Sequence, residues 1–229
     1  MSNPVLYSYF RSSCSWRVRI ALNLKGVEFE TKAVHLVKDG GEQLKDAYKD
    51  VNPMAQVPTL VHEGLTLTQS MAIMEYLEEK YSSEGSSLLP KDPIDRAHVR
   101  EISEVISSGT QPIQNLSVML KFSSEADKRS EWSNYWITKG FQGLEALLSK
   151  YSGKYCVGDE VSMADCCLIP QVYNANRFKV DMSSFPIISR ICKGLESLEA
   201  FQKAHPTAQP DCPSDLKQFS GVTLFLVYI

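Results

Sequence analysis

Near its N-terminus the chain reads YFRSSCSWRVRIAL, residues 9–22. Apolar residues 5–9 precede the serines and favour a short strand, whereas residues 15–25 carry apolar side chains at helical spacing and end at Gly26. A helix therefore begins among Ser12, Ser13, Cys14 and Ser15. Unpaired backbone N–H groups and the positive end of the helix dipole gather at such a place and stabilise an anion, including a thiolate. The segment predicts a strand–turn–helix unit with chemistry at its turn.

Composition narrows the class of protein. The 229 residues, 43% of them hydrophobic, suffice for one large domain or two small ones. The net charge is -3 without a basic block, so we expect no nucleic-acid partner. We also expect no membrane partner, since no apolar run approaches the roughly 18 residues of a span. The first four residues lack the pattern of a signal peptide.

The cysteines and histidines indicate a reducing environment without a metal. Six cysteines form neither a CxxC pair nor a disulfide-scaffold spacing, which predicts reduced thiols and a cytoplasmic location. Adjacent Cys166 and Cys167 lie in an apolar stretch and are expected in the core. Four histidines show no metal-ligand spacing, so no metal site is expected.

The order of predicted elements indicates two domains. Residues 1–84 alternate between strand-like and helix-like runs in the order β-α-β-α-β-β-α, an α/β architecture; the runs are 5–9, 15–25, 29–34, 44–51, 58–62, 66–68 and 70–81. Residues 85–92 form a linker, and residues 93–217 form an all-helical domain with helices expected over 94–106, 131–151, 163–175 and 187–200. The tail 218–229 is apolar and β-prone, and no role is assigned to it.

Two further places in the first domain belong with the serine turn. Val57 precedes Pro58 at the start of a strand, where a cis bond is compatible with the sequence and the Val57 backbone is free to pair with an extended peptide. Gln69 and Ser70 follow a hairpin and open a second helix, whose N-terminus suits a carboxylate. The element order brings both helix starts to one side of the sheet.

Together these motifs resemble the cytosolic glutathione transferases over residues 4 to about 217. The run Ser12-Ser13-Cys14-Ser15-Trp16-Arg17 is similar to the signature of the zeta class, and residues 52–53, 56–60, 69–73 and 155–165 fit the same family. The resemblance implies a thioredoxin-like N-terminal domain that binds glutathione, an all-α C-terminal domain and a homodimer. It also implies glutathione-dependent cis–trans isomerisation of maleylacetoacetate in phenylalanine and tyrosine breakdown, with transferase activity on small electrophiles such as α-haloacids.

The resemblance also assigns roles to residues. Ser12 matches the activating hydroxyl, and Ser13 and Cys14 complete the catalytic turn. Glutathione contacts are implied at Ser12, Ser13, Cys14, Ser15, Trp16, Arg17, Gln43, Val57, Gln69, Ser70, Gln111, Asn115 and Ser117. Arg177 matches an arginine that reaches a carboxylate of a dicarboxylate substrate.

Structural interpretations compete with several of these roles. Ser12 and Ser13 are also good helix caps, and Cys14 suits a small buried position as well as a reactive thiolate. Arg17 and Arg19 are both compatible with a place at the surface as solvated charges. The favoured interpretation makes Arg17 a stabiliser of the turn and Arg19 an ordinary ion-pair partner. Gln111 and Asn115 are one helical turn apart and are expected to face the same way, although they and Ser117 also suit a polar surface, as does Arg177.

Two other functions stay open, and one motif is structural. A thiol transferase would use Cys14 in a mixed disulfide with glutathione. A non-catalytic module would keep the fold for dimerisation alone. Ser162 and Asp165 fit a helix N-cap with Val161 as its hydrophobic staple, and this motif is interpreted as structural.

Overall fold

The computed structural model describes residues 2–217, so the interpretation of the tail 218–229 lies outside the described residues. Two compact units divide the chain. The first unit contains residues 2–88 and 199–217, and the second unit contains residues 89–198.

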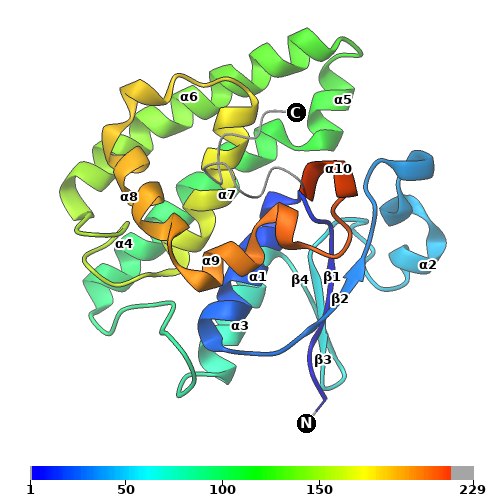
Figure 1. Ribbon diagram of the computed structural model, residues 1–229, viewed down its shortest axis with the longest axis horizontal. Coiled ribbons are helices and arrows are strands. Elements are labelled where there is room, and N and C mark those ends of the chain that lie inside the picture. Colours follow the sequence, from blue (N-terminus) through cyan, green and yellow to red (C-terminus); the bar gives the residue numbers. More distant parts are fainter. Residues whose placement is uncertain (1, 218–229) are drawn as a thin grey trace. The chain divides into compact units, whose positions relative to one another are not determined.

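The first unit is built on a mixed four-stranded sheet (Figure 1). Its strands are β1 (Val5–Ser8), β2 (Glu30–Ala33), β3 (Thr59–His62) and β4 (Leu65–Thr68), in the spatial order β2-β1-β3-β4. Strand β1 runs parallel to β2 and antiparallel to β3, with Leu6 opposite Leu60. Helices α1 (Ser13–Lys25), α2 (Asp46–Lys49) and α3 (Ser70–Lys80) complete the predicted order, and the α/β, thioredoxin-like class is confirmed.

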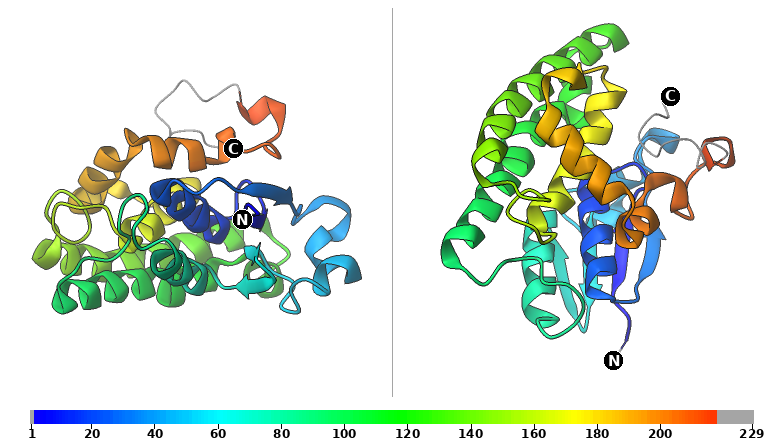
Figure 2. Two further views of the ribbon diagram at one scale, coloured as in Figure 1. Left: turned by 90° about the horizontal axis from the view of Figure 1, so that it is seen from below. Right: turned by 60° about the vertical axis from the view of Figure 1, so that its left-hand side comes forward.

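Helix α1 is buried around most of its circumference. It begins at Ser13 and ends at Gly26, whose φ of 67° is a left-handed conformation that glycine adopts without strain. It packs against α3 and also against α9 (Glu199–Ala204) from the far end of the chain. Figure 2 shows α9, in orange, alongside the blue α1 in both views. A helix enclosed in this way buries polar and apolar residues alike.

The segment that begins at Glu199 belongs to the first unit, unlike in the predicted division that placed residues 93–217 together. The expected helix 187–200 is instead two helices, α8 (Pro186–Glu196) and α9, and α9 turns back onto α1. The Arg19 Nε donates to the Ala204 carbonyl at 3.1 Å, and the Phe10 N–H donates to the Asp211 carboxylate at 2.8 Å. These long-range bonds, together with the short helices η6 (Pro206–Ala208) and α10 (Ser214–Lys217), fasten the segment to β1 and α1.

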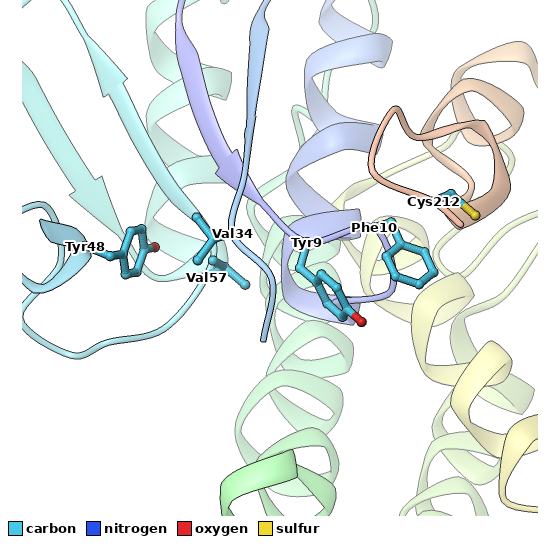
Figure 3. Packing of buried hydrophobic residues seen from close by; sticks show 6 residues of the cluster. All are labelled: Tyr9, Phe10, Val34, Tyr48, Val57 and Cys212. Carbon is cyan, nitrogen blue, oxygen red and sulfur yellow. The ribbon is translucent and has the colours of Figure 1, made fainter. Parts of the chain in front are cut away.

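A small cluster of buried side chains surrounds the β1–α1 connection. Figure 3 shows Cys212 beside Phe10, with Tyr9 next to them on the same turn. The rings of Tyr9 and Phe10 meet edge to face, with 4.7 Å between their centroids. The cluster also contains Val34, Tyr48 and Val57. The end of β1 is therefore held by residues from both ends of the described chain.

The second unit is helical, as predicted. Its helices are α4 (Pro93–Glu104), a π-helix η3 (Val105–Thr110), a 3-10 helix η4 (Gln111–Gln114), α5 (Leu116–Phe122), α6 (Ala126–Tyr151), α7 (Met163–Arg177), η5 (Met182–Ser184) and α8. No helix of the described residues is long and apolar enough to cross a membrane. Helix α7 begins at the predicted motif, where the Asp165 carboxylate accepts from the Ser162 N–H at 2.8 Å. The adjacent cysteines Cys166 and Cys167 are fully buried, in agreement with their expected core position.

Candidate functional site

The start of α1 combines a cap with a free hydroxyl hydrogen. Ser12 is the N-cap residue, and its Oγ accepts the Ser15 N–H at 3.2 Å. A hydroxyl that accepts a bond keeps its own hydrogen to donate. The capping and activating interpretations of Ser12 are therefore compatible. Cys14, the second residue of α1, is half-buried, while Ser13 is only 8% exposed.

The start of α3 is a second, strained turn. Its N-cap residue, Gln69, is exposed and has a φ of 70°, a conformation that residues other than glycine adopt rarely. Ser70 follows as the first helical residue and is buried. The Val57–Pro58 peptide bond is cis, as the sequence allowed.

Arg17 joins these two helix starts. Its side chain is 2% exposed, and its Nη1 donates to the Ser70 Oγ at 3.1 Å. Its Nε and Nη2 have no hydrogen-bond partner among the described residues. The surface interpretation of Arg17 is therefore wrong: burial puts its guanidinium between α1 and α3.

Arg19 is also buried, so its interpretation as a surface charge is wrong, and its hydrogen bonds go to neutral acceptors instead of the ion-pair partner that was expected. Its guanidinium donates to the Ser8 hydroxyl and to the carbonyls of Tyr9, Phe10 and Ala204. Burial lowers the pKa of Arg19 to about 9, against a smaller, opposite effect of the Asp211 charge. The side chain stays charged at pH 7 and holds the end of β1 to the C-terminal segment.

Among the other predicted peptide-binding positions in the first unit, Gln43 has a polar atom to spare. The Gln43 Nε2 donates to the Leu36 carbonyl at 3.2 Å, whereas its buried Oε1 has no partner among the described residues. Val57 lies just before β3. Ser15 and Trp16 differ from these positions because both are almost fully buried; Trp16 packs edge-on against His205, with 5.2 Å between ring centroids.

In the second unit, Gln111 and Asn115 do not share a helix face, so that expectation is wrong. Gln111 opens η4, whereas Asn115 has an extended ψ of 146° and caps the separate helix α5. The Asn115 Oδ1 accepts from both the Ser117 N–H and the Ser117 Oγ, at 3.2 and 3.1 Å. The break follows the π-helix η3, which hydropathy periodicity did not predict.

Arg177 lies in the last turn of α7 and is exposed. Its guanidinium carbon is 5.1 Å from the centroid of the Phe178 ring. An exposed guanidinium is compatible with both the surface and the substrate interpretation, so its role stays a prediction.

The electrostatics of the first unit favour anions. Neither α1 nor α3 has an acidic residue in its first turn, so their positive ends are not neutralised locally. Among the described residues, no group of three or more His, Cys, Asp or Glu side chains could hold a metal ion.

The sequence showed both helix starts but not Arg17 as their link, because an arginine in an apolar helix gives no local signal of its partner.

Comparison with known proteins defines the class. The model for the glutathione S-transferase N-terminal domain matches residues 11–80, and the model for the C-terminal domain of that family matches residues 112–204. The chain belongs to the glutathione S-transferase family, and the resemblance inferred from sequence is confirmed.

The names of individual similar proteins are more specific than the family. The chain is 56% identical to the maleylacetoacetate isomerase of Mus musculus, over 93% of this chain and 97% of that protein. It is 57% identical to a probable maleylacetoacetate isomerase 2 of Drosophila melanogaster, over 93% and 92%. A holo structure of a bacterial zeta-class maleylpyruvate isomerase is similar, with a TM-score of 0.87 and 41% identity over 91% of this chain and all 100% of that chain. A glutathione-bound maleylacetoacetate isomerase from Anaeromyxobacter dehalogenans has a TM-score of 0.82 and 42% identity over 92% and 98%.

Proposed function

We propose that this protein is a glutathione-dependent cis–trans isomerase that converts maleylacetoacetate to fumarylacetoacetate. The observation that carries the proposal is the pair of helix starts without acidic residues, joined by the buried guanidinium of Arg17. The names of the relatives, at more than half identity over nearly the whole chain, support the same activity.

The unpartnered polar groups of the first unit fit glutathione. It is a peptide with two carboxylates, an extended backbone and a thiol. The α3 start suits a carboxylate, and the backbone at Val57 suits the peptide. Gln43 has a buried oxygen left for an N–H donor. The thiol then belongs at Ser12, Ser13 and Cys14, the start of α1.

The chain's own part in the chemistry is electrostatic. When bound, glutathione supplies the thiolate that adds reversibly to the activated double bond, so that the resulting single bond rotates before the thiolate leaves. Ser12 donates its remaining hydroxyl hydrogen to the sulfur, and the positive end of α1 favours the thiolate over the thiol. Nearby backbone N–H groups or Arg177 support the charge that develops on the substrate.

The second unit contributes the substrate residues of the proposal. Arg177 receives one carboxylate of the dicarboxylate substrate through a charge-assisted bond. Related isomerases were solved with malonate, or with dicarboxyethyl glutathione and citrate. These ligands support a site for acidic molecules. In this proposal the polar residues of the second unit that contact glutathione are Gln111, Asn115 and Ser117.

The proposal extends to setting and assembly. The enzyme acts in phenylalanine and tyrosine breakdown in the cytoplasm, conjugates small electrophiles such as α-haloacids, and is a homodimer. Six cysteines without a disulfide in the described part of the chain are consistent with a reducing compartment. Exposed apolar side chains, including Val37, Leu44 and Met54, supply surface for a second copy to cover.

Turnover of maleylacetone with and without glutathione tests the activity. We expect isomerisation only when glutathione is present. A Cys14→Ala variant should retain isomerase activity, because glutathione and not Cys14 supplies the nucleophilic sulfur. The same variant should lose any disulfide-exchange activity. If this variant binds glutathione normally but no longer isomerises, the covalent Cys14 alternative replaces the proposal.

A further inference from the structure

Helix α7 ends in a tight turn directly after Arg177. The Val180 N–H donates to the Ala175 carbonyl at 2.9 Å. The Lys179 N–H donates to the Asn176 carbonyl, also at 2.9 Å. This pair of bonds is a Schellman motif, in which the residue at the position of Lys179 adopts a left-handed conformation. The motif fixes the backbone that carries Arg177, the last residue of α7.

Lys179 occupies a position at which helices usually have glycine. Its φ is 57°, in the left-handed region that a Cβ atom disfavours. Gly26 adopts a similar φ of 67° at the end of α1 without that cost. A left-handed residue with a side chain persists only where the surrounding structure holds it. The Lys179 side chain is exposed, so the turn depends on contacts from neighbouring residues.

Asn134 in α6 supplies such a contact. Its Nδ2 donates to the Phe178 carbonyl and to the Lys179 carbonyl, both at 2.9 Å. Carbonyls only accept, so the amide nitrogen and not the amide oxygen of Asn134 faces the turn. Neither carbonyl takes part in the two bonds of the Schellman motif, so Asn134 adds to that motif instead of duplicating it. One side chain of α6 thus holds both residues that follow Arg177.

The same turn sets the surroundings of the Arg177 guanidinium. The guanidinium carbon lies 5.1 Å from the centroid of the Phe178 ring. Phe178 is 8% exposed and offers a fixed surface, whereas Arg177 is exposed. An arginine side chain has many rotamers, and ordering it before a ligand arrives reduces the entropy that binding costs. A displacement of Phe178 would therefore release Arg177 into more conformations.

We propose that Asn134 is a positioning residue for the substrate. It holds the backbone of Phe178 and Lys179, and through them it keeps Arg177 in the orientation that receives a carboxylate. This inference rests on the proposed function, in which Arg177 binds the dicarboxylate substrate. Part of the affinity for charged substrates then depends on α6 as well as on α7. The effect is on substrate binding and not on the sulfur chemistry.

Steady-state kinetics with one charged and one neutral substrate test the inference. Maleylacetone carries a carboxylate, and its methyl ester has the same reacting double bond without the charge. Asn134→Ala should raise KM for maleylacetone by about three- to tenfold, the usual effect of one or two neutral hydrogen bonds. It should change kcat for maleylacetone and KM for the ester by less than about twofold. Gln142→Ala removes an exposed amide of the same helix and is the control, which should leave both substrates unaffected.

Further variants separate positioning from folding. The double variant Asn134→Ala/Arg177→Ala should have a KM for maleylacetone no higher than Arg177→Ala alone, because Asn134 acts through Arg177. Lys179→Gly relieves the left-handed strain and should restore part of the KM in the Asn134→Ala background, whereas Lys179→Ala removes the same charge, keeps the Cβ and should not. Asn134→Gln retains an amide donor and should restore part of the affinity, which also covers the case in which Asn134→Ala does not fold. Thermal melting of each variant checks its fold.

Other outcomes overturn the inference. An equal rise in KM for maleylacetone and its ester, or a lower melting temperature with unchanged KM values, would make Asn134 merely structural. A double variant that shows the full product of the two single effects would mean that Asn134 does not act through Arg177. Wild-type turnover with a charge-selective loss in Arg177→Ala, but none in Asn134→Ala, would overturn this inference alone. Absence of glutathione-dependent turnover in the wild type would overturn the proposed function as well.

Discussion

The two units differ in where the anion at each helix start comes from. In the second unit each of the four long helices has a carboxylate at its start. Asp92 and Asp95 serve α4, Asp127 serves α6, Asp165 serves α7, and Glu145 from α6 accepts the N–H groups of Ile187 and Ile188 in α8. In the first unit the long helices α1 and α3 begin with no acid in their first turn.

The contrast separates architecture from function. A helix start that only supports the fold is most stable when the chain supplies its own negative charge. A helix start that binds an anionic ligand must leave that position open. By this criterion we propose that α1 and α3 have functional starts and that α4, α6, α7 and α8 have structural ones. Each prediction below changes one side of this division.

Removal of the anion from a structural start should have the largest effect. Asp165→Ala should lower the free energy of unfolding by about 2–6 kcal/mol, because the buried N–H groups of Cys156 and Ser162 each lose a partner worth roughly 1–3 kcal/mol. Urea unfolding measures the loss, and the exposed Glu160→Ala is the control. Unchanged stability together with weaker glutathione binding would put α7 on the functional side.

Removal of the hydroxyl from a functional start should act mainly on rate. Ser12→Ala should lower kcat by roughly 10²–10³, the typical effect of one stabilising donor. Its lost cap should cost only about 1 kcal/mol of stability. Ser12→Thr retains both the donor and the cap and should stay close to wild type. Full activity in the alanine variant would reduce Ser12 to a cap.

Substitution of Arg177 tests the C-terminal end of α7, a helix whose start is structural in this division. If it binds substrate, Arg177→Ala should raise KM for dicarboxylates by about ten- to a hundredfold, the worth of a charge-assisted bond, and spare neutral electrophiles. If it only complements the negative end of α7, the change should cost at most about 1 kcal/mol of stability. Steady-state kinetics with one charged and one neutral substrate distinguish the two roles.

An acidic residue added to the start of α3 should supply the negative charge that the ligand would otherwise bring. We expect this change to have the smallest effect of the four. Ala72 is exposed in the first turn of α3. Ala72→Glu should stabilise the protein by about 0.3–1 kcal/mol through the helix dipole. It should weaken glutathione binding by about two- to fivefold, since the new charge competes with the ligand. Ala72→Gln is the matched neutral control, and stronger glutathione binding in the glutamate variant would contradict the division.

The sequence predicted what depends on neighbours along the chain. The element order, the starts of α1 and α3 and the cap of α7 follow from local patterns around Ser12, Ser70 and Asp165. What it missed depends on contacts between distant residues. Arg19 is buried because Ala204 returns to α1, and the helix expected over residues 187–200 breaks for the same reason. The π-helix before Gln111 depends on packing as well: a Cβ on Gly140 would lie 2.3 Å from the Thr110 Oγ1.

The return of the chain onto α1 constrains the order in which the protein is made. A ribosome releases β1 and α1 early and Ala204 and Asp211 late, yet Arg19 and the Phe10 N–H need those late residues as partners. The unit that is synthesised first is therefore completed last, after the whole helical unit has emerged. Until then the strand–turn–helix segment that carries Ser12 and Cys14 lacks part of its cover. The turn that carries Ser12 and Cys14 therefore gains its full set of long-range neighbours only after Asp211 has been synthesised, and a product that stops before Ala204 lacks them.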